Sequence, residues 1–142
     1  MLYIGIDTGT ETGLAVWDSQ RKAFKQIETM KIHTAMETVM MWSDIVGREN
    51  LTVIFEDARQ RKYLPREKSV SEYRGKLMGA GSVKRDAVIW QDFLTDKSVR
   101  FLMRKPQKGL TKWDVEAFQS VTGWTERTSY HARDAAMLVF GR

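Results

Sequence analysis

Two acidic residues follow apolar runs that have the length and composition of buried strands. Asp7 ends the run Leu2–Ile6 and precedes a turn rich in threonine and glycine, and Glu56 ends the run Leu51–Phe55. An ionised carboxylate is costly to bury unless a cation compensates its charge. Asp7 is therefore expected either to bind a cation or to cap a local turn. Because the strand Leu51–Glu56 also ends in an acid, cation binding is the favoured interpretation of Asp7.

The last apolar segment adds an imidazole and a third acid. His131 and Asp134 are three residues apart, so on a helix their side chains lie on one face. Small neighbours, including Ala132 and Ala135, would allow this helix to pack closely on a sheet. If it packs near the strand ends, all four polar side chains converge.

Such a cluster calls for divalent cations. Three carboxylates and an imidazole in one cleft would otherwise repel one another and take up protons. Carboxylate oxygens favour Mg²⁺ or Mn²⁺, and the imidazole favours Mn²⁺. Two such ions roughly 4 Å apart activate a water and stabilise the leaving oxygen in phosphodiester hydrolysis.

Each residue also has a purely structural interpretation. Asp7 fits a turn, and Glu56 fits an exposed strand end. The pair on the last helix fits a helix-start cap and an ion pair with Arg133 or another basic residue. If each interpretation were correct, the occurrence of all four polar residues in one chain with a basic stretch would be a coincidence. The shared site is therefore the favoured interpretation. Asp57 adjoins Glu56, but alternation along a strand directs it to the opposite face.

The elements that must position these residues form one α/β domain over residues 1–142. Three strands joined by short turns predict an antiparallel meander, and later strands alternate with helices. The expected strands are Leu2–Asp7, Gly13–Trp17, Phe24–Ile32, Leu51–Glu56 and Val99–Met103. The result is a mixed five-stranded sheet, three antiparallel strands followed by two parallel ones, flanked by helices.

The expected helices are less uniform in their signals. Thr34–Glu37 has capping-box spacing, and Gly47 would end that helix. Residues 59–81 contain one proline and three glycines and predict a long loop with some helical character. Ser82 would cap the next helix, in which Val83, Ala87, Trp90 and Leu94 recur at helical spacing. Two further helices are expected, one with Val115, Phe118 and Val121 inward and the other at Tyr130–Phe140.

Composition narrows the class of protein. The chain has 142 residues, of which 42% are hydrophobic, so it can close one core. It has no cysteine, which excludes disulfides and thiolate metal sites and fits a reducing cytoplasm. No apolar run approaches the roughly 20 residues that span a bilayer. No basic segment precedes the first strand, so we expect no export and no membrane partner.

The positive charge is concentrated in one stretch. The chain has a net charge of +5, and the segment from Asp57 to Asp86 carries all of this excess. A local excess of this kind predicts a surface that faces a polyanion, although a solvated loop is the alternative. The basic residues of the segment are Arg59, Arg61, Lys62, Arg66, Lys68, Arg74, Lys76, Lys84 and Arg85.

Three motifs together resemble the acidic motifs of RuvC-type Holliday-junction resolvases. They are Ile4–Gly9, Val53–Glu56 and His131–Ala136, and their order and approximate spacing match that family across nearly the whole chain. The resemblance implies a ribonuclease H-like fold. It also implies that Asp7, Glu56 and Asp134 are catalytic metal ligands. Many members have an aspartate where this chain has His131, which would then be the fourth ligand.

The resemblance also extends to lysines and to an aromatic residue. The stretch from Lys105 to Lys112 is similar to the family's essential lysines, and Lys112 is a better match than Lys108. Lys112 would stabilise charge on the scissile phosphate, or else be an exposed lysine in the first turn of a helix. Tyr63 matches, by position and type, an aromatic residue near the junction centre. The basic loop is unlike the usual bacterial one, which points to a phage-type or prophage-type variant.

The expected function is therefore a Mg²⁺- or Mn²⁺-dependent endonuclease that resolves four-way junctions by paired nicks, with two ions per site. A symmetric junction requires two opposed sites and hence a homodimer. Met36, Met40 and Trp90 are interface candidates, with core packing as the alternative. Lys105, Lys108 and Tyr63 join the basic residues as DNA contacts. The alternatives are a flap or packaging nuclease of the same fold and a DNA-binding module that does not cleave.

Overall fold

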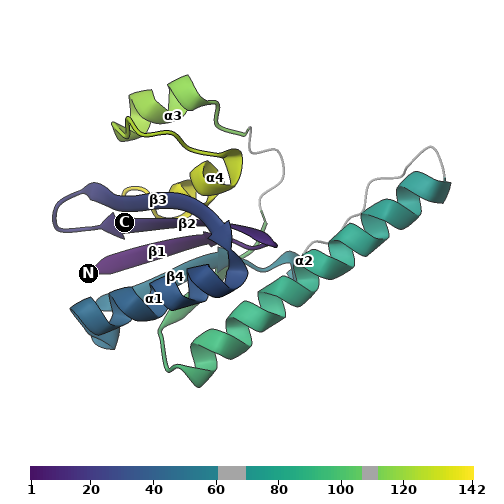
Figure 1. Cartoon of the computed structure of the whole chain (residues 1–142), viewed down its shortest axis with the longest axis horizontal. Coiled ribbons are helices and arrows are strands. Elements are labelled where there is room, and N and C mark those ends of the chain that lie inside the picture. The colour runs from purple at the N-terminus through teal and green to yellow at the C-terminus, as the bar shows by residue number, and fades with distance from the viewer. Residues whose placement is uncertain (61–69, 107–111) are drawn as a thin grey trace.

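The computed structural model describes residues 1–60, 70–106 and 112–142, without the side chains of Tyr73, Lys76 and Ala80. Its elements are arranged as Figure 1 shows. The strands are β1 (Leu2–Asp7), β2 (Glu11–Asp18), β3 (Ala23–Lys31), β4 (Leu51–Glu56) and β5 (Phe101–Arg104). The α-helices are α1 (Ile32–Val46), α2 (Val70–Asp96), α3 (Val115–Thr122) and α4 (Tyr130–Val139). Short 3-10 turns occupy Arg48–Asn50 and Ala58–Gln60.

The five strands form one mixed sheet in the order β3-β2-β1-β4-β5. Strands β1, β2 and β3 are antiparallel neighbours, whereas β1, β4 and β5 run parallel. This confirms the predicted α/β class, the meander and the two parallel strands that follow it. Strand β4 lies inside the sheet, which explains why its apolar residues are buried on both faces.

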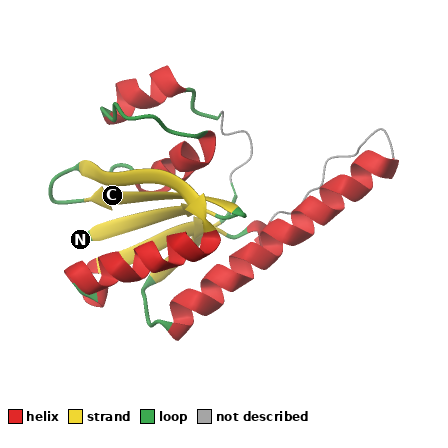
Figure 2. Ribbon diagram, in the orientation of Figure 1, coloured by secondary structure: helices red, strands yellow, loops and turns green. Residues whose placement is uncertain are grey.

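Helices cover both faces of the sheet, as the ribbon in Figure 2 shows. On one face, α1 and α2 pack against Ile4, Ile6 and Phe55. On the other, α4 and Phe118 of α3 pack against a second buried cluster that contains Ile54. Alternate residues of one strand therefore serve different cores, and strand alternation decides which face each terminal acid meets.

The start of α1 differs from the prediction. The helix begins at Ile32, directly after β3, and its N-cap Lys31 makes no side-chain capping hydrogen bond. The predicted capping box at Thr34–Glu37 is therefore wrong, because those residues already lie inside the helix. The predicted end at Gly47 is confirmed, and Gly47 has a φ of 83° that favours glycine.

Helix α2 is the largest departure from the sequence prediction. It runs for 27 residues from Val70, so the part of the expected loop from residue 70 onward is helical and Ser82 lies inside the helix. Figure 1 shows its first half extending away from the sheet. In its second half Ala87, Trp90 and Leu94 are fully buried in the core, so Trp90 is not an interface residue, whereas Val83 is 37% exposed. Among the described residues, no helix is long and apolar enough to cross a membrane.

Helix α3 lies at the edge of the fold and buries little. Phe118 is fully buried as predicted, but Val115 and Val121 are 42% and 47% exposed and do not face inward. The helix is capped at both ends: Asp114 accepts a hydrogen bond from the Ala117 backbone N–H, and Gly123 adopts a left-handed conformation.

Asp18 organises the turn between β2 and β3 and supports a prediction about stability. Its carboxylate accepts the backbone N–H groups of Gln20 and Arg21, and Lys25 lies 3.8 Å away. The Arg21 N–H in particular lowers the pKa of Asp18 below its usual 3.8. A lowered pKa stabilises the fold above the unfolded-state pKa, and this contribution is lost as the pH falls through the lower, folded-state value.

We therefore expect Asp18→Ala to lower the free energy of unfolding by about 1 kcal/mol at pH 7. The difference from the wild type should shrink on acidification below pH 3.8. Urea denaturation across this pH range measures it. A difference that stayed constant with pH would show that the charge of Asp18 contributes nothing.

Candidate active site

Strand register places two of the predicted acids side by side. Ile6 of β1 is the partner of Phe55 in β4, and Asp7 and Glu56 are the next residues along these parallel strands. Because Ile6 and Phe55 both face the α1–α2 core, alternation directs Asp7 and Glu56 to the opposite face. That is the face covered by α4, so the condition under which the four polar residues approach one another is met.

Helix α4 lies against the sheet at two glycines. A Cβ on Gly5 would lie 2.0 Å from the Ala135 carbonyl oxygen, and a Cβ on Gly13 would lie 2.0 Å from the His131 carbonyl oxygen. Only glycine leaves room for such a close approach of helix backbone to strand backbone. Gly13 is also the β2 partner of Asp7, so the same contact brings the start of α4 to the acid at the end of β1.

His131 meets Asp7 directly. The His131 Nδ1 and the Asp7 Oδ2 are 2.7 Å apart and form a half-buried hydrogen bond. Ser129 fixes the start of α4, because its hydroxyl accepts the Ala132 backbone N–H. Asp134 follows one turn after His131, so the predicted pair on one helix face is confirmed.

The site is an electrostatically coupled group of charges. Burial raises the pKa of Asp7, and the negative charge of Asp134 adds to the increase; the hydrogen bond and charge of His131 and the charge of Lys112 oppose it. Burial also raises the pKa of Asp134, with Lys112 as the largest opposing influence. The two acids, the imidazole and Lys112 therefore act on one another. In this state the carboxylates have too little positive charge around them to offset their loss of water.

Lys112 is positioned by Tyr130 and Arg133, two residues that were not predicted to belong to the site. The Lys112 ammonium lies 4.3 Å from the centre of the Tyr130 ring, and that ring lies 4.0 Å from the His131 ring. The buried Arg133 donates from Nε to the carbonyl of Trp113 and from Nη1 to the carbonyl of Thr128. Arg133 thus connects the segment next to Lys112 to α4.

Ser129, not His131, caps α4. The structural interpretation of His131 as a helix cap is therefore wrong.

The donor atoms suit a hard divalent cation, but they are not gathered around one point. Carboxylate oxygens with one imidazole are ligands for Mg²⁺ or Mn²⁺. Within the described ranges, however, no group of three or more His, Asp or Glu side chains is arranged to hold a metal ion. Asp7 and His131 instead bond to each other.

Asp57 faces away from Glu56, as predicted, and pairs with Arg59. Its buried carboxylate accepts Arg59 Nε at 2.7 Å and Nη2 at 3.1 Å, and Arg59 also donates to Gln91 of α2. These contacts lie on the α2 side of the sheet, opposite to Glu56. Arg59 therefore joins the end of β4 to α2, and its guanidinium is engaged within the chain although it was expected to contact DNA.

The other expected DNA contacts fall into three groups. Arg74, Lys84, Arg85 and Lys105 are exposed, as is the predicted catalytic residue Lys112. Lys76 lies on α2, but its side chain is outside the described part. Arg61, Lys62, Tyr63, Arg66, Lys68 and Lys108 lie outside the described residues altogether.

Arg104 is an addition that the sequence analysis missed. It is the β5 partner of Glu56 and adjoins Lys105, so two basic residues stand at the carboxyl edge of the sheet beside the acids. The adjacent basic residues Arg104 and Lys105 at the end of the last strand were the sequence feature that could have indicated it.

The comparisons with known proteins add no family assignment. No model of a known protein family matches the chain, and no curated protein matches it either. A function must therefore be argued from the arrangement of its own residues.

Proposed function

We propose that this protein is a metal-dependent endonuclease with a ribonuclease H-like fold, acting on four-way junctions or other branched DNA by paired phosphodiester hydrolysis. The observation that carries the proposal is the meeting of β1, β4 and α4. Asp7 and Glu56 end adjacent parallel strands on the face where α4 presents His131 and Asp134. We place its action in the cytoplasm of a bacterial or phage-infected cell.

Each residue has a distinct part in the proposal. Asp7, Glu56, Asp134 and His131 would hold Mg²⁺ or Mn²⁺, two ions per site, and the ions would supply an activated water and charge neutralisation at the leaving oxygen. His131 orients the Asp7 carboxylate through their 2.7 Å contact. Lys112, held over the Tyr130 ring, is placed to contact the phosphate and stabilise developing negative charge.

The substrate class is supported by the charge around this edge. Lys105 and Lys112 are exposed, and Arg104 ends the strand beside Glu56. Basic side chains that contact phosphates position DNA without reading its bases, so recognition would depend on branch shape. Paired nicks across a symmetric junction require two opposed sites, and hence a C2 dimer.

The direct test is a labelled four-way junction incubated with the chain and Mg²⁺, Mn²⁺ or EDTA. Linear duplex and a flap substrate of the same sequence serve as controls, and the product ends are mapped. Symmetric nicks near the branch only with metal support the proposal. Cleavage confined to flaps or linear DNA would identify another nuclease of this fold.

One observation favours a second candidate, a junction-binding module that does not cleave. The described acids and His131 are not arranged around a single metal position. Tight junction binding, with no nicks in either metal ion, would select this candidate.

The basic stretch after β4 gives a prediction about DNA affinity. We expect Arg61→Ala with Lys62→Ala to weaken junction binding. The slope of log K against log salt should become smaller in magnitude by about 1–2, because fewer phosphate contacts mean that fewer counterions are released on binding. Fluorescence anisotropy at several salt concentrations measures the slope. Lys22→Ala with Lys25→Ala, at the opposite end of the sheet, is the control. An unchanged slope in the first variant would place the DNA surface elsewhere.

A further inference from the structure

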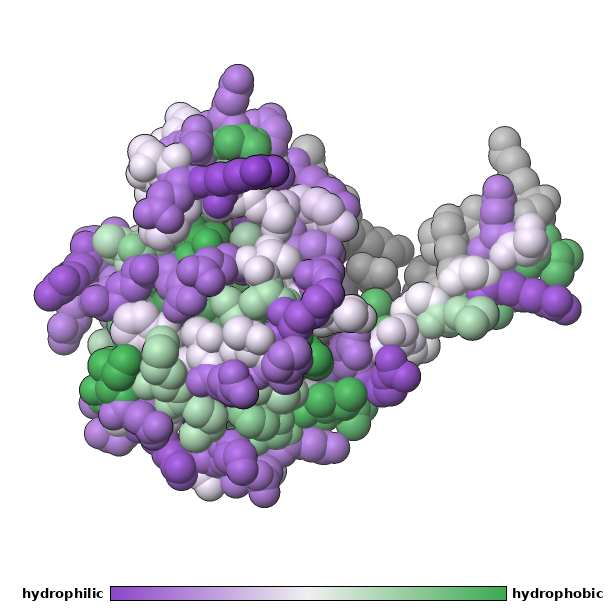
Figure 3. Space-filling model, in the orientation of Figure 1, coloured by the Kyte–Doolittle hydropathy of each residue, from purple (hydrophilic) through white to green (hydrophobic). Residues whose placement is uncertain are grey.

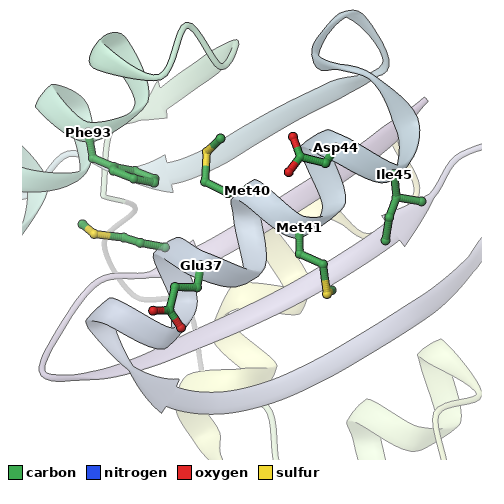
Figure 4. Close-up of a pocket in the computed structure, with 7 residues that line it drawn as sticks. Glu37, Met40, Met41, Asp44, Ile45 and Phe93 are labelled. Carbon is green, nitrogen blue, oxygen red and sulfur yellow. The ribbon is translucent and has the colours of Figure 1, made fainter.

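An open groove runs along the outer side of α1, where this helix meets α2. The groove measures about 550 Å³, and its apolar lining consists of Met36, Met40, Met41, Ile45 and Phe93. Met41 is 47% exposed and Ile45 is 63% exposed. Figure 3 shows hydrophobic side chains among hydrophilic ones over α1, and Figure 4 shows Phe93 of α2 directed toward the α1 residues. The outward face of a surface helix is normally polar, so this apolar lining marks α1 as a contact surface.

The apolar residues of α1 form two pairs along the helix. Met36 and Met40 are half-buried, because they also pack against the core, whereas Met41 and Ile45 are exposed. The members of each pair are four residues apart and are therefore neighbours on the helix surface. Together the pairs extend about 13 Å along the axis. Methionine side chains are flexible and adapt to the shape of a partner, so this lining suits a docking surface.

Two acids add negative charge to the groove. Glu37 and Asp44 both line it and both are exposed. They are seven residues apart, which places them on one side of α1 and about 10 Å apart along its axis. Figure 4 shows Met40 and Met41 between them. Within the described ranges neither carboxylate forms an ion pair, although the chain as a whole has a net charge of +5.

The charge of the groove decides between its possible occupants. Both acids repel the phosphates of DNA and the head groups of anionic lipids. A two-fold pairing of this groove with that of a second copy would bring Glu37 of one chain against Asp44 of the other, and like charges at an interface are costly. A cationic segment of another protein is instead attracted at both positions.

The backbone of α1 decides how such a segment is recognised. The N–H and C=O groups inside an α-helix are already hydrogen-bonded, so a peptide cannot add here as a strand. Binding must therefore come from side chains that enter the groove. An amphipathic helix presents apolar residues three or four positions apart on one face. Two basic residues seven positions apart on that helix reproduce the spacing of Glu37 and Asp44.

We infer that the groove between α1 and α2 is a docking site for a cationic amphipathic helix of another protein. Its apolar face lies on the methionines and Phe93, and two of its basic residues pair with Glu37 and Asp44. The sheet lies between this groove and the face covered by α4, where the proposed active site is. A docked helix therefore leaves the proposed active site accessible.

Binding of a designed peptide to the full chain tests the charge complementarity. The probe is a labelled helical peptide of about 18 residues, with leucines along one face and two arginines seven positions apart beside them. Fluorescence anisotropy should show saturable binding that weakens as salt is added. Glu37→Lys with Asp44→Lys should raise the Kd by at least about tenfold, because like charges then face each other. The same variant should bind a second peptide, in which glutamates replace the arginines, as tightly as the wild type binds the first.

The matched control for this charge reversal is Glu116→Lys with Glu126→Lys. Both acids are exposed, at and after α3 on the other side of the sheet, and the change in net charge is the same. The control should bind the arginine peptide as the wild type does. The inference is overturned if the wild type shows no saturable binding, or if both double variants lose affinity equally.

Met41→Ser with Ile45→Ser tests the apolar part of the groove. Both side chains are exposed in the free chain, so the variant should stay folded, which circular dichroism checks. Its Kd for the arginine peptide should rise at least about tenfold, because the apolar area that docking buries is lost. Val115→Ser with Val121→Ser, which changes two exposed residues of α3, should leave the Kd unchanged. Wild-type affinity in the α1 variant would overturn the inference.

Sedimentation equilibrium of the chain alone tests the competing occupant, a second copy. We expect Met41→Ser with Ile45→Ser to leave any self-association unchanged, because the groove belongs to a different partner. Self-association that is present in the wild type and lost in this variant would place a second copy in the groove and overturn the inference.

These measurements are separate from the proposed nuclease activity, because none of them requires DNA or a metal ion. Peptide binding by a chain that cleaves no junction would reject only the nuclease. Junction cleavage by a chain that does not bind the peptide would reject only the docking site.

Discussion

Replacing Asp7 by asparagine is expected to reduce junction cleavage by about a thousandfold or more while leaving junction binding nearly unchanged. Asparagine has the same shape and can keep a hydrogen bond to His131, but it lacks the negative charge. In the proposed site, Asp7 ends β1 next to Glu56 and is the acid that contacts α4. The variant therefore removes charge from the point where the three elements meet.

Binding should survive because the substitution removes no positive charge that faces DNA. Loss of one carboxylate beside the phosphates would, if anything, strengthen the complex. The cleavage rate of a labelled junction in Mn²⁺ and its Kd in EDTA measure the two effects separately. Glu28→Gln, an exposed neutralisation on β3, is the matched control and should cleave as the wild type does. Retained cleavage by Asp7→Asn would remove Asp7 from the mechanism.

The sheet was predictable because its strands have short, strong apolar patterns. Helix α2 was not, since Gly75, Gly79 and Gly81 resemble a loop, whereas most residues between them are good helix formers. The start of α1 was misplaced because β3 runs directly into it, and no side-chain cap marks the boundary. The predicted inward orientation of Val115 was wrong because Phe118 is the one residue of α3 that is buried in the core.

The candidate site was predictable where it depends on periodicity. Two buried-type strands that end in acids indicated Asp7 and Glu56, and helical spacing placed His131 with Asp134. The contact between Lys112 and Tyr130 was not predictable, because it depends on how the segment before α3 folds back on α4. Nor does any sequence period reveal that a glycine in β2 lies against the backbone of α4.

That glycine leads to the second large effect, which does not depend on any proposed activity. Gly13→Ala is expected to lower the free energy of unfolding by about 2–3 kcal/mol, at the upper end of the range for overpacking. The added methyl would lie 2.0 Å from the His131 carbonyl oxygen and 2.4 Å from its carbon, both of them backbone atoms. A rotating side chain cannot relieve this clash, so the start of α4 must move away from β2.

The movement has a local signature that distinguishes it from general loss of stability. Gly13 is the β2 partner of Asp7, and His131 contacts both, through its backbone carbonyl at Gly13 and its imidazole at Asp7. A shift of the start of α4 should therefore lengthen and break the 2.7 Å contact between His131 and Asp7. Urea denaturation measures the stability, and the imidazole NMR resonances of His131 report the lost hydrogen bond. Gly9→Ala is the matched control, because its Cβ would meet only the Glu11 carbonyl oxygen at 3.4 Å. If Gly13→Ala is as stable as Gly9→Ala and its His131 resonances are unchanged, the close docking of α4 on the sheet is not what holds His131 against Asp7.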